Sequence, residues 1–420
     1  MPIIIPYVPR TITVHLGLPE QWAENVTVSF PDYVKNVASS EIYPTWEPAA
    51  IRANVLAIIS FALNRVYTEF YPSRGYDFQI TSTTQYDQKF IRGRNIFENI
   101  SQVVDEIFND YIRRQGYIEP LAAKFCNGTT STCNGLSQWG SQELAQEGQN
   151  SIEILRHYYG DNIELVVDAP IQDITNSYPG TPMRMGAVGQ NVAMFQSMLN
   201  RISQNYPAIP KISPVSGVFE EDTRDAVRTF QRIFNLDPDG VVGKATWYKM
   251  VYLYGGILQL AELVSQGQRF VTVQFQFSGP LEEGDSGPEV GILQYMLALL
   301  AQFDSSLSPI TVDGEFGPST TRAVRTYQQL VGLTPDGNVD ETTWNSIYSN
   351  FALADYFLRR DTVRAQSLRE NAVPVMLQGD AAPELEAERW DDTPRMSQYP
   401  GRPLNLGQMD GQHGQRGVKV

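Results

Sequence analysis

The 420-residue sequence contains only two cysteines and three histidines. Structural zinc usually takes four nitrogen or sulfur ligands. The chain offers few candidate ligands of this kind: Cys126, Cys133, His15, His157 and His413. No metal or other cofactor is expected. Three interpretations of the cysteine pair stay open: a small disulfide loop, half of a metal site, or two unpaired thiols.

Positive charge is also scarce. Lysine and arginine total 32 against 47 acidic residues, which gives a net charge of −15. Nucleic-acid binding needs cationic side chains that displace counterions from phosphates, and anionic lipid attracts basic segments. The composition therefore disfavours both partners, whereas a neutral glycan tolerates an acidic chain.

Long hydrophobic runs are missing. No stretch of about 18 apolar residues suggests a membrane-spanning helix. The first residues, Met1–Pro6, lack the basic segment, long apolar run and small-residue cleavage site of a secretory signal, so none is expected. Hydrophobic residues still make up 42% of the chain, enough for globular cores, and the length predicts two to four domains.

One sequence pattern occurs twice in the second half of the chain. Apolar residues at helical spacing predict three helices in each copy, and Pro-Asp-Gly triplets predict tight turns. Thr223 and Thr320 are expected to satisfy backbone N–H groups near helix starts. The matching segments are residues 186–199 and 284–297, 217–219 and 314–316, 223–231 and 320–328, 238–240 and 335–337, and Trp247 and Trp344.

This pattern resembles the peptidoglycan-binding-1 repeat of many bacterial wall hydrolases. The resemblance covers residues 180–254 and 280–351. It implies two three-helix modules that dock on wall glycan. Nearly all the shared residues are expected in cores and turns, so they identify a fold rather than a ligand pocket.

The N-terminal region combines strand and helix patterns. Residues 11–16 and 26–30 are rich in β-branched residues and predict strands. A buried helix is expected to begin near Pro48, and an apolar stripe predicts a second helix over residues 95–114. The sequence therefore predicts an α+β domain ahead of the helical repeats.

Two motifs at opposite ends of this region resemble the family of stage II sporulation protein D. The resemblance covers residues 10–168 and implies a lytic transglycosylase fold acting on peptidoglycan. The motifs are residues 32–54, with Tyr33-Val34, Ser40-Glu41, Trp46 and Ala50-Ile51-Arg52-Ala53-Asn54, and residues 134–159, with Gly135-Leu136-Ser137-Gln138-Trp139-Gly140 and Glu153-Ile154-Leu155.

The chemistry implied by this resemblance needs one carboxylic acid. That group protonates the glycosidic oxygen and then, as a base, takes a proton from the sugar hydroxyl that closes an anhydro ring. Ala49 stands where the family has its catalytic glutamate, which leaves Glu47 and Glu41 as the candidate acids. The resemblance places Trp46, Gly135, Ser137, Gln138 and Trp139 at the substrate.

The sequence is interpreted as an α+β multidomain chain. The predicted parts are a sporulation protein D-like domain (1–168), a linker (169–183), the first repeat (184–256), a connecting segment (257–279), the second repeat (280–352) and a polar tail (353–420). Residues 271–277 alternate like a strand, and this segment and the tail are candidates for self-association.

The main functional hypothesis is a peptidoglycan-binding protein of the bacterial envelope or spore coat, with a degenerate transglycosylase-like domain. One alternative is a structural subunit of a self-assembling fibre, spore appendage, coat or tail-like particle. Another is an active, divergent transglycosylase that uses Glu47 or Glu41.

Overall fold

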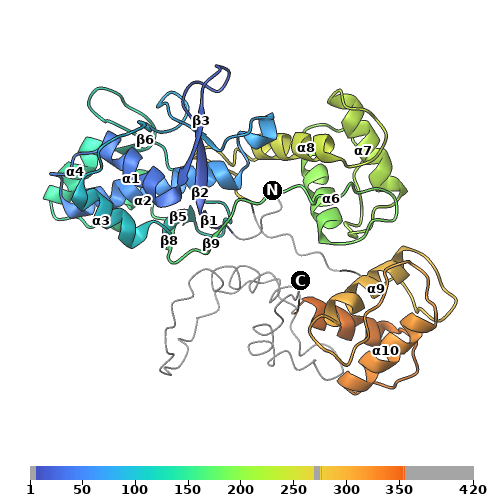
Figure 1. Cartoon of the computed structure of the whole chain (residues 1–420). Coiled ribbons are helices and arrows are strands. Elements are labelled where there is room, and N and C mark those ends of the chain that lie inside the picture. The colour runs from blue at the N-terminus through green and yellow to red at the C-terminus, as the bar shows by residue number, and fades with distance from the viewer. Residues whose placement is uncertain (1–5, 269–274, 276, 353, 355–420) are drawn as a thin grey trace. The chain divides into compact units, whose positions relative to one another are not determined.

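The computed structural model describes residues 6–268, 275, 277–352 and 354 (Figure 1). Contacts divide the chain into two compact units. The first unit holds residues 1–182, 198–209 and 229–270, and the second holds residues 183–197, 210–228 and the chain from residue 271 onward. Most of the predicted strand at 271–277, and the tail from 355, lie outside the described residues.

The first strands form a small three-stranded sheet. β2 (Thr11–His15) pairs antiparallel with β3 (Asn25–Ser29) and parallel with β4 (Ile80–Thr81), in the order β3-β2-β4. Ile12 and Val14 of the central strand are fully buried, as their alternation in the sequence suggests. The two predicted strands are confirmed to within one residue.

Helix α2 (Pro48–Tyr67) is the core of the N-terminal domain. It contacts helices α1 (Phe30–Glu41), α3 (Glu98–Ile107), α4 (Gln138–Gln146) and α5 (Ser151–Tyr159). The stretch Pro48–Arg74 is long and apolar enough to cross a membrane by length and composition, but 89% of its most apolar window is buried within the protein. This burial is typical of a core helix.

The predicted second helix is wrong in its last third. Helix α3 ends at Ile107, and Tyr111–Arg114 form strand β5, which pairs antiparallel with β8 (Ile163–Val166). Tyr111 and Ile112 are buried in this strand. The apolar residues that extended the helical pattern are therefore the inward side chains of a strand, and their partner lies about 50 residues later in the sequence.

The remaining elements of the N-terminal domain are short. Strand β1 (Val8–Pro9) pairs in parallel with β9 (Ile171–Gln172), and β6 (Phe125–Cys126) pairs in parallel with β7 (Leu136–Ser137). A 3-10 turn, η1 (Pro72–Arg74), follows α2 and contacts the first repeat's third helix.

Each repeat has three helices, as predicted. The first repeat has α6 (Gln190–Ser203), α7 (Glu221–Ile233) and α8 (Lys244–Ile257). The second has α9 (Pro288–Leu300), α10 (Pro318–Val331) and a third helix over residues 341–352. Trp247 and Trp344 are fully buried in these third helices.

The start of the connecting segment is packed against the N-terminal domain. Leu260 and Leu263 are buried, and the side chain of Asn64 on α2 donates a 2.8 Å hydrogen bond to the carbonyl of Leu260. Buried Glu119 accepts hydrogen bonds from Ser265 and from the backbone of Gln268. Residues 258–268 are therefore part of the domain rather than a free connection between the repeats.

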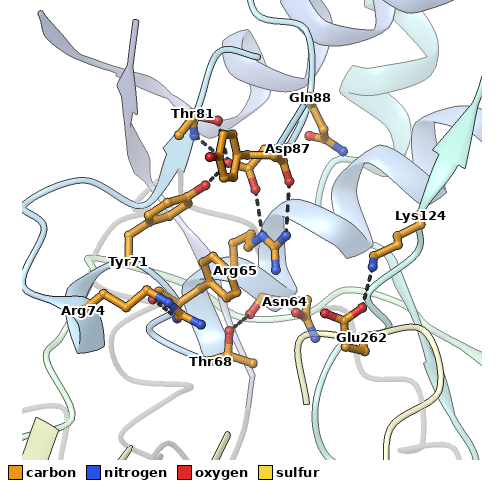
Figure 2. Close-up of polar contacts among 12 residues, drawn as sticks. Asn64, Arg65, Thr68, Tyr71, Arg74, Thr81, Asp87, Gln88, Lys124 and Glu262 are labelled. Carbon is orange, nitrogen blue, oxygen red and sulfur yellow. Dashed lines mark hydrogen bonds and ion pairs between the residues drawn. The ribbon is translucent and has the colours of Figure 1, made fainter. Parts of the chain in front are cut away.

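A buried ion pair fixes the loop that leaves β4 (Figure 2). Arg65 on α2 donates to the carboxylate of Asp87 over 2.8 Å, and the two side chains are 6% and 0% exposed. The second carboxylate oxygen of Asp87 accepts hydrogen bonds from Tyr71 and from the backbone and hydroxyl of Thr81. The pair thus determines where the following residues, Gln88 and Lys89, lie.

Candidate functional site

Two buried glutamines organise the second repeat. Gln294 on α9 accepts from the backbone N–H of Gly314 and donates to the carboxylate of Asp313, at 2.8 Å in each case. Gln328 on α10 does the same for Gly337 and Asp336, at 2.9 Å. Each glutamine therefore clamps one Asp-Gly turn. The two glycines have φ of 75° and 85°, a region that favours residues without a Cβ atom.

The first repeat contains the same clamps. Gln231 accepts from Gly240 and donates to Asp239, whereas Gln196 accepts from Gly217 and donates to the carbonyl of Val218. All four glutamines are 0–1% exposed. Each clamp replaces water by several hydrogen bonds to one buried amide, which explains why the glutamine and glycine recur at matching positions.

The role predicted for the two threonines is corrected. Thr223 and Thr320 do not cap helices through their hydroxyls. Instead, these hydroxyls accept hydrogen bonds from the amides of Gln196 and Gln294, over 2.9 and 3.1 Å. Both threonines are fully buried, so they belong to the clamps.

Each repeat also binds the segment that precedes it through its buried tryptophan. The indole N–H of Trp247 donates to Ser177 over 2.9 Å, and that of Trp344 donates to the carbonyl of Phe275 over 3.0 Å. Ser177 lies in the predicted linker and Phe275 in the connecting segment. The described repeat residues thus form a hydrogen-bonded scaffold, and a ligand would be bound by the surface that this scaffold supports.

In the N-terminal domain, three aromatic side chains form a cluster, and two of them, Tyr43 and Trp46, stand between the candidate acids Glu41 and Glu47 in the sequence. Trp46 and Trp139 contact each other edge to face with ring centres 5.1 Å apart. Tyr43 lies 5.7 Å from Trp46 and 5.6 Å from Trp139. Trp46 is buried, Trp139 half-buried and Tyr43 54% exposed. Tyr43 was missed in the sequence, although it stands only three residues before Trp46.

Of the candidate acids, Glu41 is the one whose carboxylate accepts a hydrogen bond from a predicted substrate residue, Gln138. One carboxylate oxygen lies 3.3 Å from the donating amide of Gln138, and the other accepts the backbone N–H of Lys89 over 3.0 Å. Gln138 is 2% exposed and Glu41 is half-buried. Helices α1 and α4 therefore bring together two residues that are 97 positions apart.

Glu47 occupies a different position. It is exposed at the start of α2, and its backbone N–H donates to Gln142 of α4 over 2.8 Å. Ala49 is half-buried in the first turn of the same helix. A methyl group thus stands at the position where the resemblance implies a carboxylic acid.

Gly135 and Ser137 have structural surroundings. A Cβ atom at Gly135 would lie 2.2 Å from the carbonyl oxygen of Lys124. The Ser137 hydroxyl caps α4 by accepting from the backbone of Gly140. Their role at a substrate stays a prediction, because both sites are explained by close backbone packing and helix capping.

The two cysteines form a disulfide in the structure. Cys126 and Cys133 are joined with their Cα atoms 6.0 Å apart. The closed loop is connected to the aromatic cluster, since the backbone N–H of Trp139 donates to the carbonyl of Asn127. Among the described residues, no group of three or more histidine, cysteine, aspartate or glutamate side chains could hold a metal ion.

A buried carboxylate connects the N-terminal domain to the first repeat. Glu69, just after α2, accepts hydrogen bonds from the backbone and hydroxyl of Ser177, the residue to which Trp247 donates. Burial raises the pKa of the Glu69 carboxyl, although both hydrogen bonds act in the opposite direction. The folded state therefore holds this proton more tightly than the unfolded state does.

This raised pKa predicts a pH-dependent contribution to stability. The contribution of Glu69 should be largest below the ordinary glutamate pKa and should be lost as the pH rises through the higher folded-state pKa. We expect the melting temperature of the natural chain, relative to Glu69→Gln, to fall as the pH rises from about 4 to about 8. Glu143→Gln, at an exposed glutamate of α4, controls for the loss of one charge. A difference that grows with pH would contradict this assignment.

Comparison with known proteins identifies the repeats. Residues 188–250 and 286–347 each match the family model described as "Putative peptidoglycan binding domain". The chain therefore contains two copies of this domain, and the predicted resemblance is confirmed there. The N-terminal domain lies outside both matched spans, so its own resemblance stays a prediction.

Three curated proteins are similar over parts of the chain. The zinc D-Ala-D-Ala carboxypeptidase of Streptomyces albus G is 38% identical over 74 residues, 18% of this chain and 28% of that protein. The N-acetylmuramoyl-L-alanine amidase CwlL of Bacillus licheniformis is 28% identical over 165 residues, 38% of this chain and 42% of the amidase.

The third relative is the N-acetylmuramoyl-L-alanine amidase CwlM of Mycobacterium tuberculosis. It is 33% identical over 131 residues, 31% of this chain and 27% of the amidase. The chain thus spans less than half the length of each of these three relatives.

Proposed function

We propose that this chain docks on peptidoglycan through its two repeats. The observation that carries this proposal is the pair of family matches, which coincide with the two clamped three-helix scaffolds. The names of the similar proteins support it, because all three describe enzymes that act on peptide or amide bonds of the wall. The net charge of −15 is compatible with a glycan and unsuited to polyanions.

Two docking sites on one chain should give avidity. Linking two binding modules makes the second binding event intramolecular and can raise the overall affinity by about 10²–10⁴-fold. We expect the full chain to co-sediment with purified sacculi at least about tenfold more tightly than a chain that ends at residue 270, which keeps one repeat.

The contrary results are specific. A folded full chain that stays in the supernatant at all salt concentrations would exclude wall docking. Equal affinity of the full and shortened chains would assign docking to the first repeat or to the N-terminal domain.

For the N-terminal domain, we propose a glycan-facing module of the sporulation protein D type that has lost its catalytic acid. Support comes from Ala49 at the implied acid position and from the exposed Glu47 beside it. A chain of this kind would use the aromatic cluster of Tyr43, Trp46 and Trp139 to contact sugar rings rather than to cleave between them. The proposed setting is the bacterial envelope or spore surface.

One observation favours a second candidate, an active transglycosylase. Glu41 is half-buried and accepts a hydrogen bond from Gln138, the residue before Trp139 of the aromatic cluster. This candidate and the pseudoenzyme differ in one measurable product, the anhydro-muropeptide.

A further inference from the structure

Trp22 is the most exposed large hydrophobic side chain among the described residues. It is 98% exposed, whereas Trp46, Trp247 and Trp344 are at most 7% exposed. It lies in the loop between β2 and β3, which extends from the helical part of the domain (Figure 1). A fully hydrated indole forgoes the burial of roughly 150–250 Å² of surface. The exposed indole is available to a ligand, and tryptophan is enriched at interfaces because it combines a large apolar surface with an N–H donor.

The loop that carries Trp22 is held by hydrogen bonds from a buried residue of β2, His15. The buried imidazole of His15 donates through Nε2 to the carbonyl oxygens of Leu18 and Gln21, both 3.1 Å away. Its Nδ1 lies 2.7 Å from the side-chain oxygen of Asn25. The ring also stacks on Phe78 with centres 4.6 Å apart. The backbone on the N-terminal side of Trp22 is therefore fixed before any ligand arrives, which lowers the entropic cost of binding.

Three residues close to Trp22 in the chain carry hydrogen-bonding side chains. Glu20 and Gln21 are exposed, and Glu24 is paired with Arg92 across 2.5 Å. The carboxylate of Glu20 would repel the phosphates of an anionic membrane or a nucleic acid, whereas the carboxylate of Glu24 is paired with Arg92. Carboxylates accept hydrogen bonds from hydroxyl groups, and the Gln21 amide can both donate to and accept from an N-acetyl group.

From this combination we propose that the β2–β3 loop is a separate glycan-binding site. The face of the Trp22 indole stacks on the C–H groups of an N-acetylated pyranose ring. Glu20 and Gln21 bind the hydroxyl and acetamido groups at the edge of that ring. The inference rests on the proposed docking function and adds a contact that neither repeat supplies. It assigns the site to the loop, not to the cluster of Tyr43, Trp46 and Trp139.

The test uses the full chain and tetra-N-acetylchitotetraose as the probe. With ¹⁵N-labelled tryptophan, the chain should give six indole N–H signals in solution, and Trp22→Phe identifies the signal of Trp22. We expect the probe to shift this signal. Trp22→Ala should weaken the affinity of the chain for the probe by at least about tenfold, whereas Trp22→Phe should retain most of that affinity. Val167→Ala, at another exposed apolar residue, should change nothing.

Three results would overturn the site. The Trp22 signal could stay unmoved at saturating probe while the full chain still binds sacculi, in which case docking stands and the loop site fails. Trp22-dependent binding to vesicles of phosphatidylcholine and phosphatidylglycerol, with no response to the sugar, would assign the loop to lipid. Self-association that Trp22→Ala abolishes, again without a response to the sugar, would assign it to a second copy of the chain. Loss of sacculus binding with an intact sugar response would reject docking by the repeats and retain the site.

Discussion

Replacing Asp87 by alanine should destabilise the N-terminal domain by about 3–5 kcal/mol, the usual cost of leaving a buried charge without its partner. Arg65, whose side chain is 6% exposed and lies against the rings of Phe61 and Phe70, would keep the carbonyl of Tyr86 as its acceptor among the described residues. Tyr71 and Thr81 would lose the acceptor they share (Figure 2). Urea denaturation of the full chain measures the loss.

The control is a partly exposed pair in the same domain, in which the side chain of Lys35 is 16% exposed. Lys35 and Asp105 lie 2.7 Å apart, and Asp105 is 59% exposed. Asp105→Ala should therefore cost less than about 1 kcal/mol. If Asp87→Ala and Asp105→Ala lowered the free energy of unfolding equally, the buried pair would stabilise the domain no more than the control pair does. The double variant Arg65→Met, Asp87→Leu should lose less than Asp87→Ala, because it removes both charges.

The unaltered chain should release no detectable anhydro-muropeptide from glycan strands without stem peptides. A general acid typically contributes about 10²–10⁴-fold to the rate, and position 49 holds a methyl group in its place. Ala49→Glu should introduce turnover if the aromatic cluster binds the strand. Chromatography of the released products measures both forms, with Ala49→Gln as the matched variant that adds size without an acid.

Product from the natural chain would refute the loss of activity and select the alternative. Glu41→Gln should then abolish the product, because Glu41 alone of the two candidates contacts Gln138. Glu47→Gln should leave the rate unchanged, since Glu47 is exposed and only its backbone bonds to Gln142. The opposite pattern would make Glu47 the acid.

The repeats could be predicted almost completely because their signals are local and occur twice. Each glutamine clamps a glycine turn within the same repeat, so Gln294 with Gly314 and Gln328 with Gly337 recur in order and spacing. The position of Thr223 and Thr320 near the helix starts could be predicted, but their hydrogen-bonding role could not. Their hydroxyls could be read as helix caps from the sequence, and only the packed structure brings them to the glutamine amides.

Other features depended on partners distant in the sequence. The helical stripe over residues 95–114 is broken because Tyr111–Arg114 pair with Ile163–Val166, and ladder hydrogen bonds outweigh a weak local preference. The start of the connecting segment, residues 258–268, packs on the N-terminal domain because Leu263 joins its core and Asn64 bonds to Leu260. Nothing in the residues near position 260 carries that information.

For the candidate sites, the residue types could be taken directly from the sequence. It located the tryptophans, the glutamates and the alanine at position 49. The different surroundings of Glu41 and Glu47 became visible in the fold, because the contact of Glu41 with Gln138 joins two helices across 97 positions of sequence. The fold also decided that Trp22 is exposed while Trp247 and Trp344 are buried. A side chain's burial depends on everything that packs around it, and no short stretch of sequence contains those neighbours.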